Sequence, residues 1–245
     1  MTAADHEEWA RARVRAILER GPERRVVAVL VTSSDGAAAL RGRTAGLTSD
    51  ADRALLRAWR EVADALLVGT GTLTAELYSG TILGDRARAR RIDRGRPALP
   101  PILTIDRGGA LDVSVALRGE GPPPLIVYGA RGSARGDSRV SWVELDEPTV
   151  ERVVADARER LDARVLVAEG GPRLFRAALA EGVLSDLSLT VAPHAVGAGP
   201  YIWDSSGGPP RHRDLVPVER IDGFTFRHWA LEPGGAAPEG GEPTG

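Results

Sequence analysis

Three glycine-containing turns are the stretches of this sequence best suited to chemistry. They are SSDG (33–36), GTGTL (69–73) and EGGP (169–172), and each follows a run of apolar residues that predicts a buried strand. A strand that turns into a helix presents free backbone N–H groups at the positive end of the helix dipole, an arrangement that suits a phosphate or pyrophosphate. Taken singly, each stretch is also what an ordinary turn needs.

The EGGP turn has the features of an anion-binding helix start. Gly170 and Gly171 would let a ligand approach the backbone closely, and Pro172 fits the first helical position. GTGTL is not a Rossmann fingerprint, because Thr74 stands where the third glycine is needed, and it is not a P-loop either. Since the carboxyl ends of parallel strands share one edge of a sheet, we expect these turns to form a single groove for a dinucleotide.

Composition excludes several other chemistries. The chain has no cysteine and no lysine, which rules out thiolates, disulfides, Cys-ligated zinc and Schiff-base catalysis. The four histidines lack metal-ligand spacing, so we expect no metal site, and a net charge of −2 does not favour nucleic acid or anionic membrane. The N-terminus lacks the features of a signal peptide, and no apolar run reaches the roughly 20 residues that span a bilayer. We therefore expect a soluble, cytoplasmic protein with a small-molecule substrate.

The hydrophobic pattern indicates an α/β fold. It predicts helices over 6–20, 50–63, 148–162 and 172–181, and strands over 25–32, 64–69, 101–106, 124–129, 140–145, 165–168 and 186–193. An Asp-Gly pair at 222–223 between VPVERI and FTFRHWAL predicts a β-hairpin. Residues 75–100 are polar and Arg-rich, and the pattern leaves their structure undecided. We expect a three-layer sandwich with a mostly parallel mixed sheet and a C-terminal antiparallel hairpin.

Taken together, these stretches resemble the reductase domain of bacterial riboflavin biosynthesis, a family with the dihydrofolate reductase fold. The matching segments are SSDG, GLTSDADR (46–53), ADALLVGTGTL (63–73), VLVAEGGPRLF (165–175) and LSDLSLTVAPHAVGAG (184–199). The chain looks most similar to the stand-alone pyrimidine reductase-like branch, which lacks the zinc-binding deaminase domain. The resemblance covers the reductase domain (25–232). It leaves an N-terminal helical extension (1–24) and a tail (233–245) whose Gly/Pro-rich composition predicts disorder.

The resemblance implies NADPH as the hydride donor, a homodimer and a set of site residues. It places the cofactor along Thr32, Gly69, Thr70, Gly71, Thr72, Glu76, Gly170, Gly171, Pro172, Arg173 and Leu174. It places the substrate against Thr44, Arg60 and Glu169, and gives catalytic roles to Asp35 and Glu169. From the residues alone, Arg107 could bind the adenosine 2′-phosphate bidentately or be a solvated turn residue, and neighbouring Asp106 is a weaker signal for NADH.

Several departures from the family pattern lie on the substrate side. Ala37 follows SSDG where the family has Lys or Arg, Gly46 replaces a Trp, and the family's D-P-x-L-T-V-R segment is unrecognisable in ELYSGTILGDR (76–86). Three functions therefore remain open. The first is hydride transfer to the ribosylamine carbon of 5-amino-6-(5-phosphoribosylamino)uracil. The second is reduction of a pterin or another imine or carbonyl, and the third is a non-catalytic nucleotide-binding module.

Overall fold

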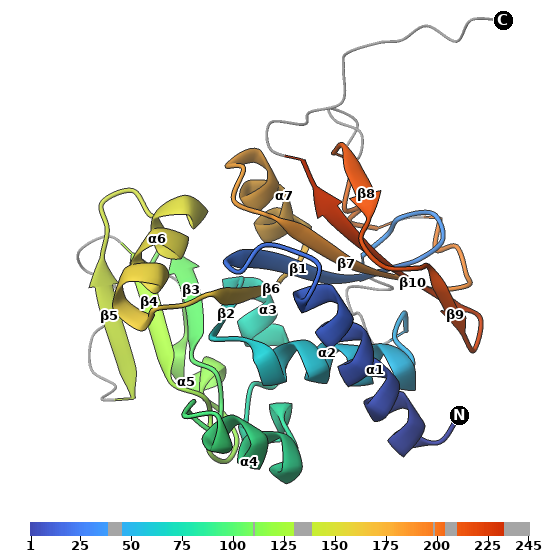
Figure 1. The fold of residues 1–245 in the computed structure, drawn as a ribbon. Helices are drawn as coiled ribbons and strands as arrows, with labels where there is room; N and C mark the ends of the chain where they lie inside the picture. Colours follow the sequence, from blue (N-terminus) through green and yellow to red (C-terminus); the bar gives the residue numbers. More distant parts are fainter. Residues whose placement is uncertain (39–45, 110, 130–138, 198, 204–209, 233–245) are drawn as a thin grey trace, which may run out of the picture.

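The computed structural model describes residues 1–38, 46–109, 111–129, 139–197, 199–203 and 210–232, which form one large sheet covered by helices (Figure 1). The strands are β1 (Arg25–Thr32), β2 (Ala65–Val68), β3 (Ile102–Asp106), β4 (Leu125–Gly129), β5 (Val140–Glu144), β6 (Val165–Glu169), β7 (Asp186–Val191), β8 (His212–Asp214), β9 (Glu219–Ile221) and β10 (Phe224–Leu231). The helices are α1 (Ala3–Leu18), α2 (Asp50–Val62), α3 (Thr70–Ala75), the 3₁₀ turn η1 (Gly80–Ile82), α4 (Asp85–Asp93), α5 (Val113–Ala116), α6 (Val150–Leu161) and α7 (Pro172–Ala180).

The sheet is mixed, as predicted. Its strand order is β5-β4-β3-β2-β6-β1-β7-β10-β8, with β9 paired to β10. In this order, every strand from β5 at one edge of the sheet to β7 runs parallel to its neighbours. Strand β10 runs antiparallel to β7, β8 and β9. The predicted hairpin is confirmed: β9 and β10 meet at Asp222 and Gly223, whose φ angles of 51° and 85° are those of a tight hairpin turn.

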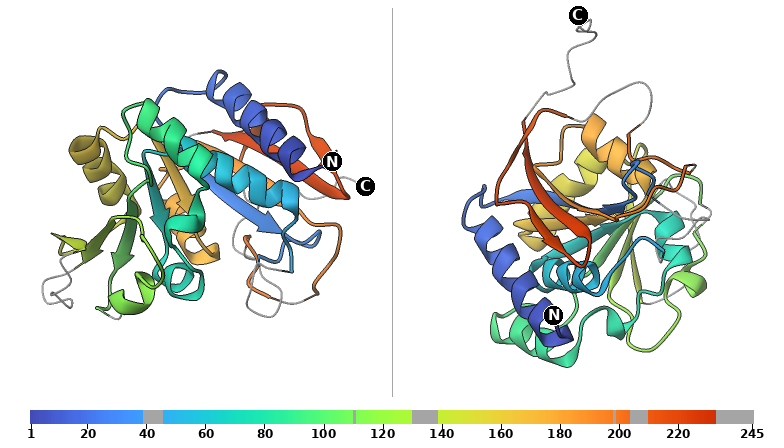
Figure 2. Two further views of the ribbon diagram at one scale, coloured as in Figure 1. Left: turned by 90° about the horizontal axis from the view of Figure 1, so that it is seen from below. Right: turned by 90° about the vertical axis from the view of Figure 1, so that its right-hand side faces the viewer.

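Helices cover both faces of the sheet (Figures 1 and 2). Because strand side chains alternate between faces, Val165 and Val167 of β6 pack into one core with α1 and α2, while Leu166 and Ala168 pack into a second core with α6 and α7. Glu169 ends the same strand and, two residues after Val167, points to the same face as Val165 and Val167. Its side chain therefore lies on the α2 face.

Helix α2 is capped at its start and anchored to the sheet near its end. Its predicted start is confirmed, since the Ser49 hydroxyl accepts a hydrogen bond from the backbone N–H of Asp52 at 3.1 Å. Near its other end, the fully buried Trp59 donates from its indole to Ser188 of β7 at 3.2 Å and stacks on His228 of β10 at 5.6 Å between ring centroids. This anchorage fixes the position of the neighbouring Arg60.

The Arg-rich stretch 75–100 that the pattern left undecided contains η1 and α4 and directly follows α3. Helix α4 is held on α2 by its arginines. Arg91 is fully buried and donates to the carbonyls of Ala63 and Glu61 at 2.6 and 2.9 Å, which satisfies backbone groups at the end of α2. Arg90 forms two 2.7 Å hydrogen bonds to the Glu61 carboxylate. The positive charges in this stretch therefore serve mainly to attach α4.

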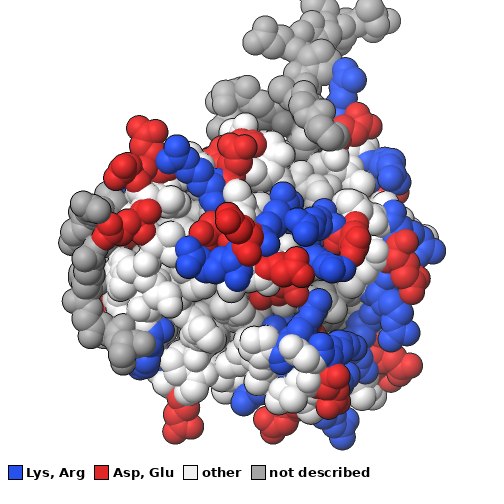
Figure 3. Space-filling model, turned by 60° about the vertical axis from the view of Figure 1, so that its left-hand side comes forward, with Lys and Arg blue, Asp and Glu red and all other residues white. Residues whose placement is uncertain are grey.

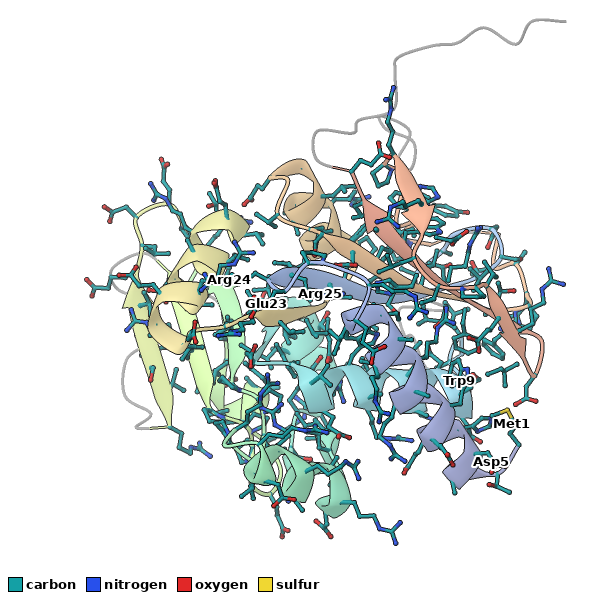
Figure 4. The ribbon with its side chains drawn as sticks, viewed as in Figure 1. Met1, Asp5, Trp9, Glu23, Arg24 and Arg25 are labelled. Carbon is teal, nitrogen blue, oxygen red and sulfur yellow. The ribbon has the colours of Figure 1, made fainter. Side chains whose placement is uncertain are left out.

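The N-terminal helix is found three residues earlier than predicted, because Thr2 and Asp5 form a capping box. It packs along α2 and reaches the C-terminal strands through Trp9, which donates to Glu219 of β9 (Figure 4). At the start of β1, the buried Arg25 donates to the carbonyl of Pro22 at 2.9 Å and lies 3.7 Å from Asp186. These contacts join α1 to the main sheet.

Several boundaries differ from the prediction. Helix α6 begins at Val150 with Thr149 as its N-cap, so Pro148 lies just before the helix rather than in its first turn. Strand β8 and helix α5 were not predicted, and β9 takes only the end of VPVERI. The predicted tail (233–245) lies outside the described residues.

The described residues include no helix with the length and apolar character needed to cross a bilayer. On the face shown in Figure 3, arginines and acidic side chains are interspersed rather than gathered in a patch of one sign.

Candidate active site at the carboxyl edge of the sheet

The connections that leave β2 and β6 diverge at the carboxyl edge of the sheet. The two strands are parallel neighbours, with Val68 opposite Glu169 at their ends. After β2 the chain enters α3, whose Leu73 packs in the core of the α2 face. After β6 it enters α7, whose Phe175 packs in the core of the opposite face. This divergence is the topological switch point at which open α/β sheets bind their ligands.

The third turn lies at the same edge. Strand β1 pairs with β6 only over Arg25–Ala28 and then continues beside β7 to Thr32, so its carboxyl end extends beyond the end of the pairing with β6. Thr32 is buried, and its carbonyl accepts from the backbone N–H of Ala192 at 2.7 Å. The SSDG, GTGTL and EGGP turns thus follow three adjacent strands, β1, β2 and β6, at one end of the sheet.

Both helices that begin at the switch point lack a side-chain cap. Helix α3 starts after Gly69 and α7 after Gly171, and no side chain of the described residues caps either helix. Helices α1, α2, α5 and α6 are instead capped by Thr2, Ser49, Asp112 and Thr149. The remaining α-helix, α4, also begins after a glycine, Gly84, but packs against α2. The first-turn N–H groups of α7 are therefore open to a ligand anion.

The glycines at this edge have different surroundings. A Cβ on Gly170 would lie 2.6 Å from Cδ2 and 3.0 Å from Cβ of Leu174, so glycine at this position lets Leu174 pack closely on the turn. A Cβ on Gly69 would lie 3.8 Å from Cβ of Leu174. The Leu174 side chain is therefore packed between the GTGTL and EGGP turns. A Cβ on Gly71 or Gly171 would meet no atom within 4 Å. These two positions leave open space beside backbone amides.

Glu169 and Arg60, two of the expected substrate residues, are paired with each other. Arg60 Nε donates to Glu169 Oε1 at 2.8 Å, and Nη2 donates to Oε2 at 2.6 Å. The Glu169 side chain is 5% exposed and that of Arg60 is 14% exposed. Burial by itself lowers the pKa of Arg60, but the charge and hydrogen bonds of Glu169 outweigh it and raise that pKa above its usual value. Removing one partner of such a buried pair costs roughly 3–5 kcal/mol.

Tyr78 completes this cluster, and the sequence analysis missed it. Its hydroxyl donates to Glu169 Oε2 at 3.2 Å, and its ring lies 5.4 Å from the Arg60 guanidinium carbon. Burial, followed by the negative charge of Glu169, raises the pKa of Tyr78 well above its usual value, so the hydroxyl remains a donor. The available signal was a single aromatic residue followed by Ser-Gly, the only aromatic residue between 75 and 100.

The Asp35 carboxylate stabilises the SSDG turn by hydrogen bonds. It accepts from the Ser33 hydroxyl and from the backbone N–H groups of Val196, at 3.1 Å, and Gly197, at 2.8 Å. The Ser33 hydrogen bond, then those of Gly197 and Val196, lower the pKa of Asp35 to about 2. An exposed carboxylate held in this way stays ionised and joins the SSDG turn to residues 196–197. The structure thus gives Asp35 an ordering role in this turn.

The remaining expected residues lie around the same edge. Thr70 and Thr72 are partly buried in α3, Arg173 is exposed in the first turn of α7, and Glu76 is exposed just after α3. Arg107 is exposed after β3 and donates from Nε to the carbonyl of Pro148 at 3.2 Å.

Thr44 lies outside the described residues. Within the described part of the chain, no group of three or more His, Asp or Glu side chains is placed to hold a metal ion.

Comparison with known proteins agrees with this architecture. The RibD C-terminal domain model matches residues 24–223. A pyrimidine reductase-like protein from Corynebacterium diphtheriae superposes with a TM-score of 0.69 at 21% identity, with 86% of this chain and 92% of that one covered. The riboflavin biosynthesis reductase of Saccharomyces cerevisiae gives 0.56 at 16% identity, over 85% of this chain and 90% of that one.

A longer relative contains the same fold as one part. A diaminohydroxyphosphoribosylaminopyrimidine deaminase/5-amino-6-(5-phosphoribosylamino)uracil reductase from Thermotoga maritima gives a TM-score of 0.67 at 22% identity, with 89% of this chain covered but only 59% of that one. Comparison with curated proteins gives no match. The family model spans most of the sequence, from just before β1 to the β9–β10 turn. The chain therefore belongs to the RibD C-terminal domain family, the reductase domain family of riboflavin biosynthesis.

Proposed function

We propose that this protein is an NADPH-dependent reductase whose cofactor binds across the carboxyl ends of β2 and β6. The observation that supports this most directly is the start of α7, which lacks a side-chain cap and has open space at Gly171, beside the point where the connections diverge. The start of α3 after Gly69 adds further backbone donors at the same edge. Together these features suit a pyrophosphate.

The proposal gives roles to several residues at this edge. The first turn of α7 holds the pyrophosphate, the end of β1 at Thr32 flanks the nicotinamide, and Arg107 binds the adenosine 2′-phosphate. The bound cofactor supplies the hydride. The protein's contribution is to align cofactor and substrate and to exclude water, which hydride transfer needs more than a strong acid or base. Glu169 accepts hydrogen bonds from the substrate, and Asp35 keeps the β1 turn ordered.

The proposed substrate is 5-amino-6-(5-phosphoribosylamino)uracil, reduced at the ribosylamine carbon so that the ribose opens to a ribityl chain. The family, and the activity named for the Thermotoga maritima relative, support this substrate. One observation favours a second candidate. Because Nε and Nη2 of Arg60 both bind Glu169, that arginine is not poised for a substrate phosphate. A pterin or another ring-bearing imine without a phosphate would suit this arrangement.

The test combines binding with turnover. Calorimetric titration with NADPH and with NADH should give heat for at least NADPH. NADPH oxidation is then followed with the deaminated pyrimidine riboside phosphate, with dihydrofolate and with no substrate. Oxidation with the pyrimidine supports the first substrate, and oxidation with dihydrofolate alone supports the second. Stabilisation by NADPH without turnover would indicate a non-catalytic nucleotide-binding module, and no heat with either cofactor would refute the proposal.

We also propose that the protein is a homodimer, as the family resemblance implies. Light scattering coupled to size exclusion should then give a mass of twice the 26.0 kDa chain. A mass equal to one chain would reject the dimer.

A further inference from the structure

The segment in which this sequence departs from its family carries a side chain into the candidate site. Tyr78 lies in ELYSGTILGDR and is 2% exposed, although the residues on its N-terminal side, Glu76 and Leu77, are exposed. Its hydroxyl reaches Glu169, 91 positions further along the chain. A residue from the segment that departs from the family pattern thus contacts Glu169, the carboxylate of the EGGP turn.

The two oxygens of Glu169 are used unequally. Oε2 accepts from Arg60 Nη2 at 2.6 Å, from Arg60 Nε at 3.1 Å and from the Tyr78 hydroxyl at 3.2 Å. Oε1 accepts only from Arg60 Nε, at 2.8 Å, among the described residues. A carboxylate oxygen can accept about two hydrogen bonds. Oε1 therefore retains acceptor capacity, while Oε2 is fully used in holding the group in place.

A role in stability alone explains this cluster poorly. Burying an ion pair gains little over apolar residues of similar volume, because the desolvation of both charges offsets their attraction. Here the pair lies at the end of β6, directly before Gly170 and Gly171, where the helices on either side diverge. A carboxylate held by three donors at this place has the fixed geometry that a ligand-binding group requires.

We propose that Tyr78 and Arg60 are positioning residues that hold Glu169 as an oriented acceptor, so that Oε1 receives a hydrogen bond from a hydroxyl or ring N–H of the substrate. This inference rests on the proposed function, because it needs a substrate at this edge. It assigns the subsite to a neutral, hydrogen-bond-donating group. Arg60 acts through Glu169 and does not bind the substrate phosphate.

The phosphate dependence of binding distinguishes this role from direct phosphate recognition. The probes are the ribityl product, 5-amino-6-ribitylaminouracil, with and without its phosphate, titrated into the NADP⁺-bound protein. Arg60→Met should weaken both probes by the same factor, because it disturbs Glu169. Arg60→Lys retains the charge and guards against failure of Arg60→Met to fold. A loss confined to the phosphorylated probe in either variant would overturn the proposal.

Tyr78→Phe should weaken both probes about three- to tenfold, the usual effect of one lost hydrogen bond. Its main effect should be on the KM of the substrate rather than on kcat, because Tyr78 orients a substrate-binding carboxylate. NADPH binding should be unchanged. Tyr128→Phe is the matched control: its buried hydroxyl also donates to a carboxylate, that of Asp156, at 2.8 Å, but on β4 and α6. Equal losses in the two variants would show a general packing effect and overturn the positioning role.

A measurement without ligand separates this inference from the proposed function. In thermal unfolding, Tyr78→Phe and Glu169→Gln should be non-additive, whereas Tyr128→Phe and Glu169→Gln should add. Additivity in the first pair would remove the contact on which the inference rests, whatever the protein reduces. If Tyr78→Phe and Glu169→Gln are non-additive but the wild-type protein binds neither probe, the contact stands. The proposed substrate and the ligand-facing role of Oε1 are then overturned together.

Discussion

The adjacent glycines Gly170 and Gly171 allow a sharp test of the proposed cofactor edge, because an added methyl group meets different surroundings at each. At Gly170 a Cβ would lie 2.6 Å from Cδ2 and 3.0 Å from Cβ of Leu174. At Gly171 it would have no heavy atom within 4 Å. We therefore expect Gly170→Ala to strain the fold, and Gly171→Ala to place a methyl group where a phosphate is proposed to bind.

The expected magnitudes follow from these distances. Cδ2 of Leu174 can rotate away, but Cβ is fixed by the helix, so Gly170→Ala should cost about 1–3 kcal/mol as overpacking. For a chain of this size that lowers the melting temperature by about 2–4 °C per kcal/mol. At Gly171 the backbone has φ −70° and ψ 178°, which alanine adopts freely. Alanine is a poorer N-cap than glycine but restricts the unfolded chain, so stability should stay within about 1 kcal/mol of wild type.

The assay pairs thermal unfolding without cofactor with calorimetric titration by NADPH. Gly171→Ala should unfold as the wild type does but bind NADPH about tenfold more weakly or worse, because one charge-assisted hydrogen bond is worth about 1.5–3 kcal/mol. Gly84→Ala is the matched control, since Gly84 also precedes a helix without a side-chain cap and has no atom within 4 Å of an added Cβ. It should change neither quantity. Unaltered NADPH affinity in Gly171→Ala would refute the reasoning.

Three further predictions address charge. Arg107→Ala should reduce the preference for NADPH over NADH by about tenfold or more, because a charge-assisted bond to the 2′-phosphate is lost; unchanged kcat/KM ratios for the two cofactors would reject this role. The pKa of Asp35, lowered to about 2 mainly by the Ser33 hydroxyl, means that its contribution to stability is present above the unfolded-state value near 4 and is lost as pH falls from about 4 to 2. Asp35→Asn should flatten that part of the stability profile, and an unchanged profile would contradict it. Burial lowers the pKa of His228, so the unfolded chain takes up its proton first, and stability should fall as pH drops below about 6.5; His228→Gln should diminish that fall, measured by urea unfolding at pH values from 5 to 8, and an identical slope in both proteins would contradict the burial argument.

Local signals in the sequence were sufficient for much of the fold. Ser49 before an amphipathic run predicted α2, Pro172 after two glycines predicted the start of α7, and Asp222-Gly223 predicted the β9–β10 turn. Each of these signals acts within a few residues, through a capping hydrogen bond, a fixed φ or a turn that favours positive φ. The glycine turns also predicted which end of the sheet carries the ligand groove, because parallel strands bring their carboxyl ends to one edge.

The elements that the sequence left undecided depend on partners far along the chain. Helix α4 has few apolar residues, and it is held on α2 because the buried Arg91 binds carbonyls at the end of that helix. No local pattern encodes such a contact.

The candidate site shows the same division. The sequence determined which residue types stand at the edge, namely the glycines, Glu169 and an arginine preceding β2. Only the tertiary structure decided that Arg60 and Tyr78 both bind Glu169, since their positions relative to β6 depend on how α2 and the segment after α3 pack on the sheet. Packing over such separations is fixed by the whole core, which no short stretch of sequence specifies.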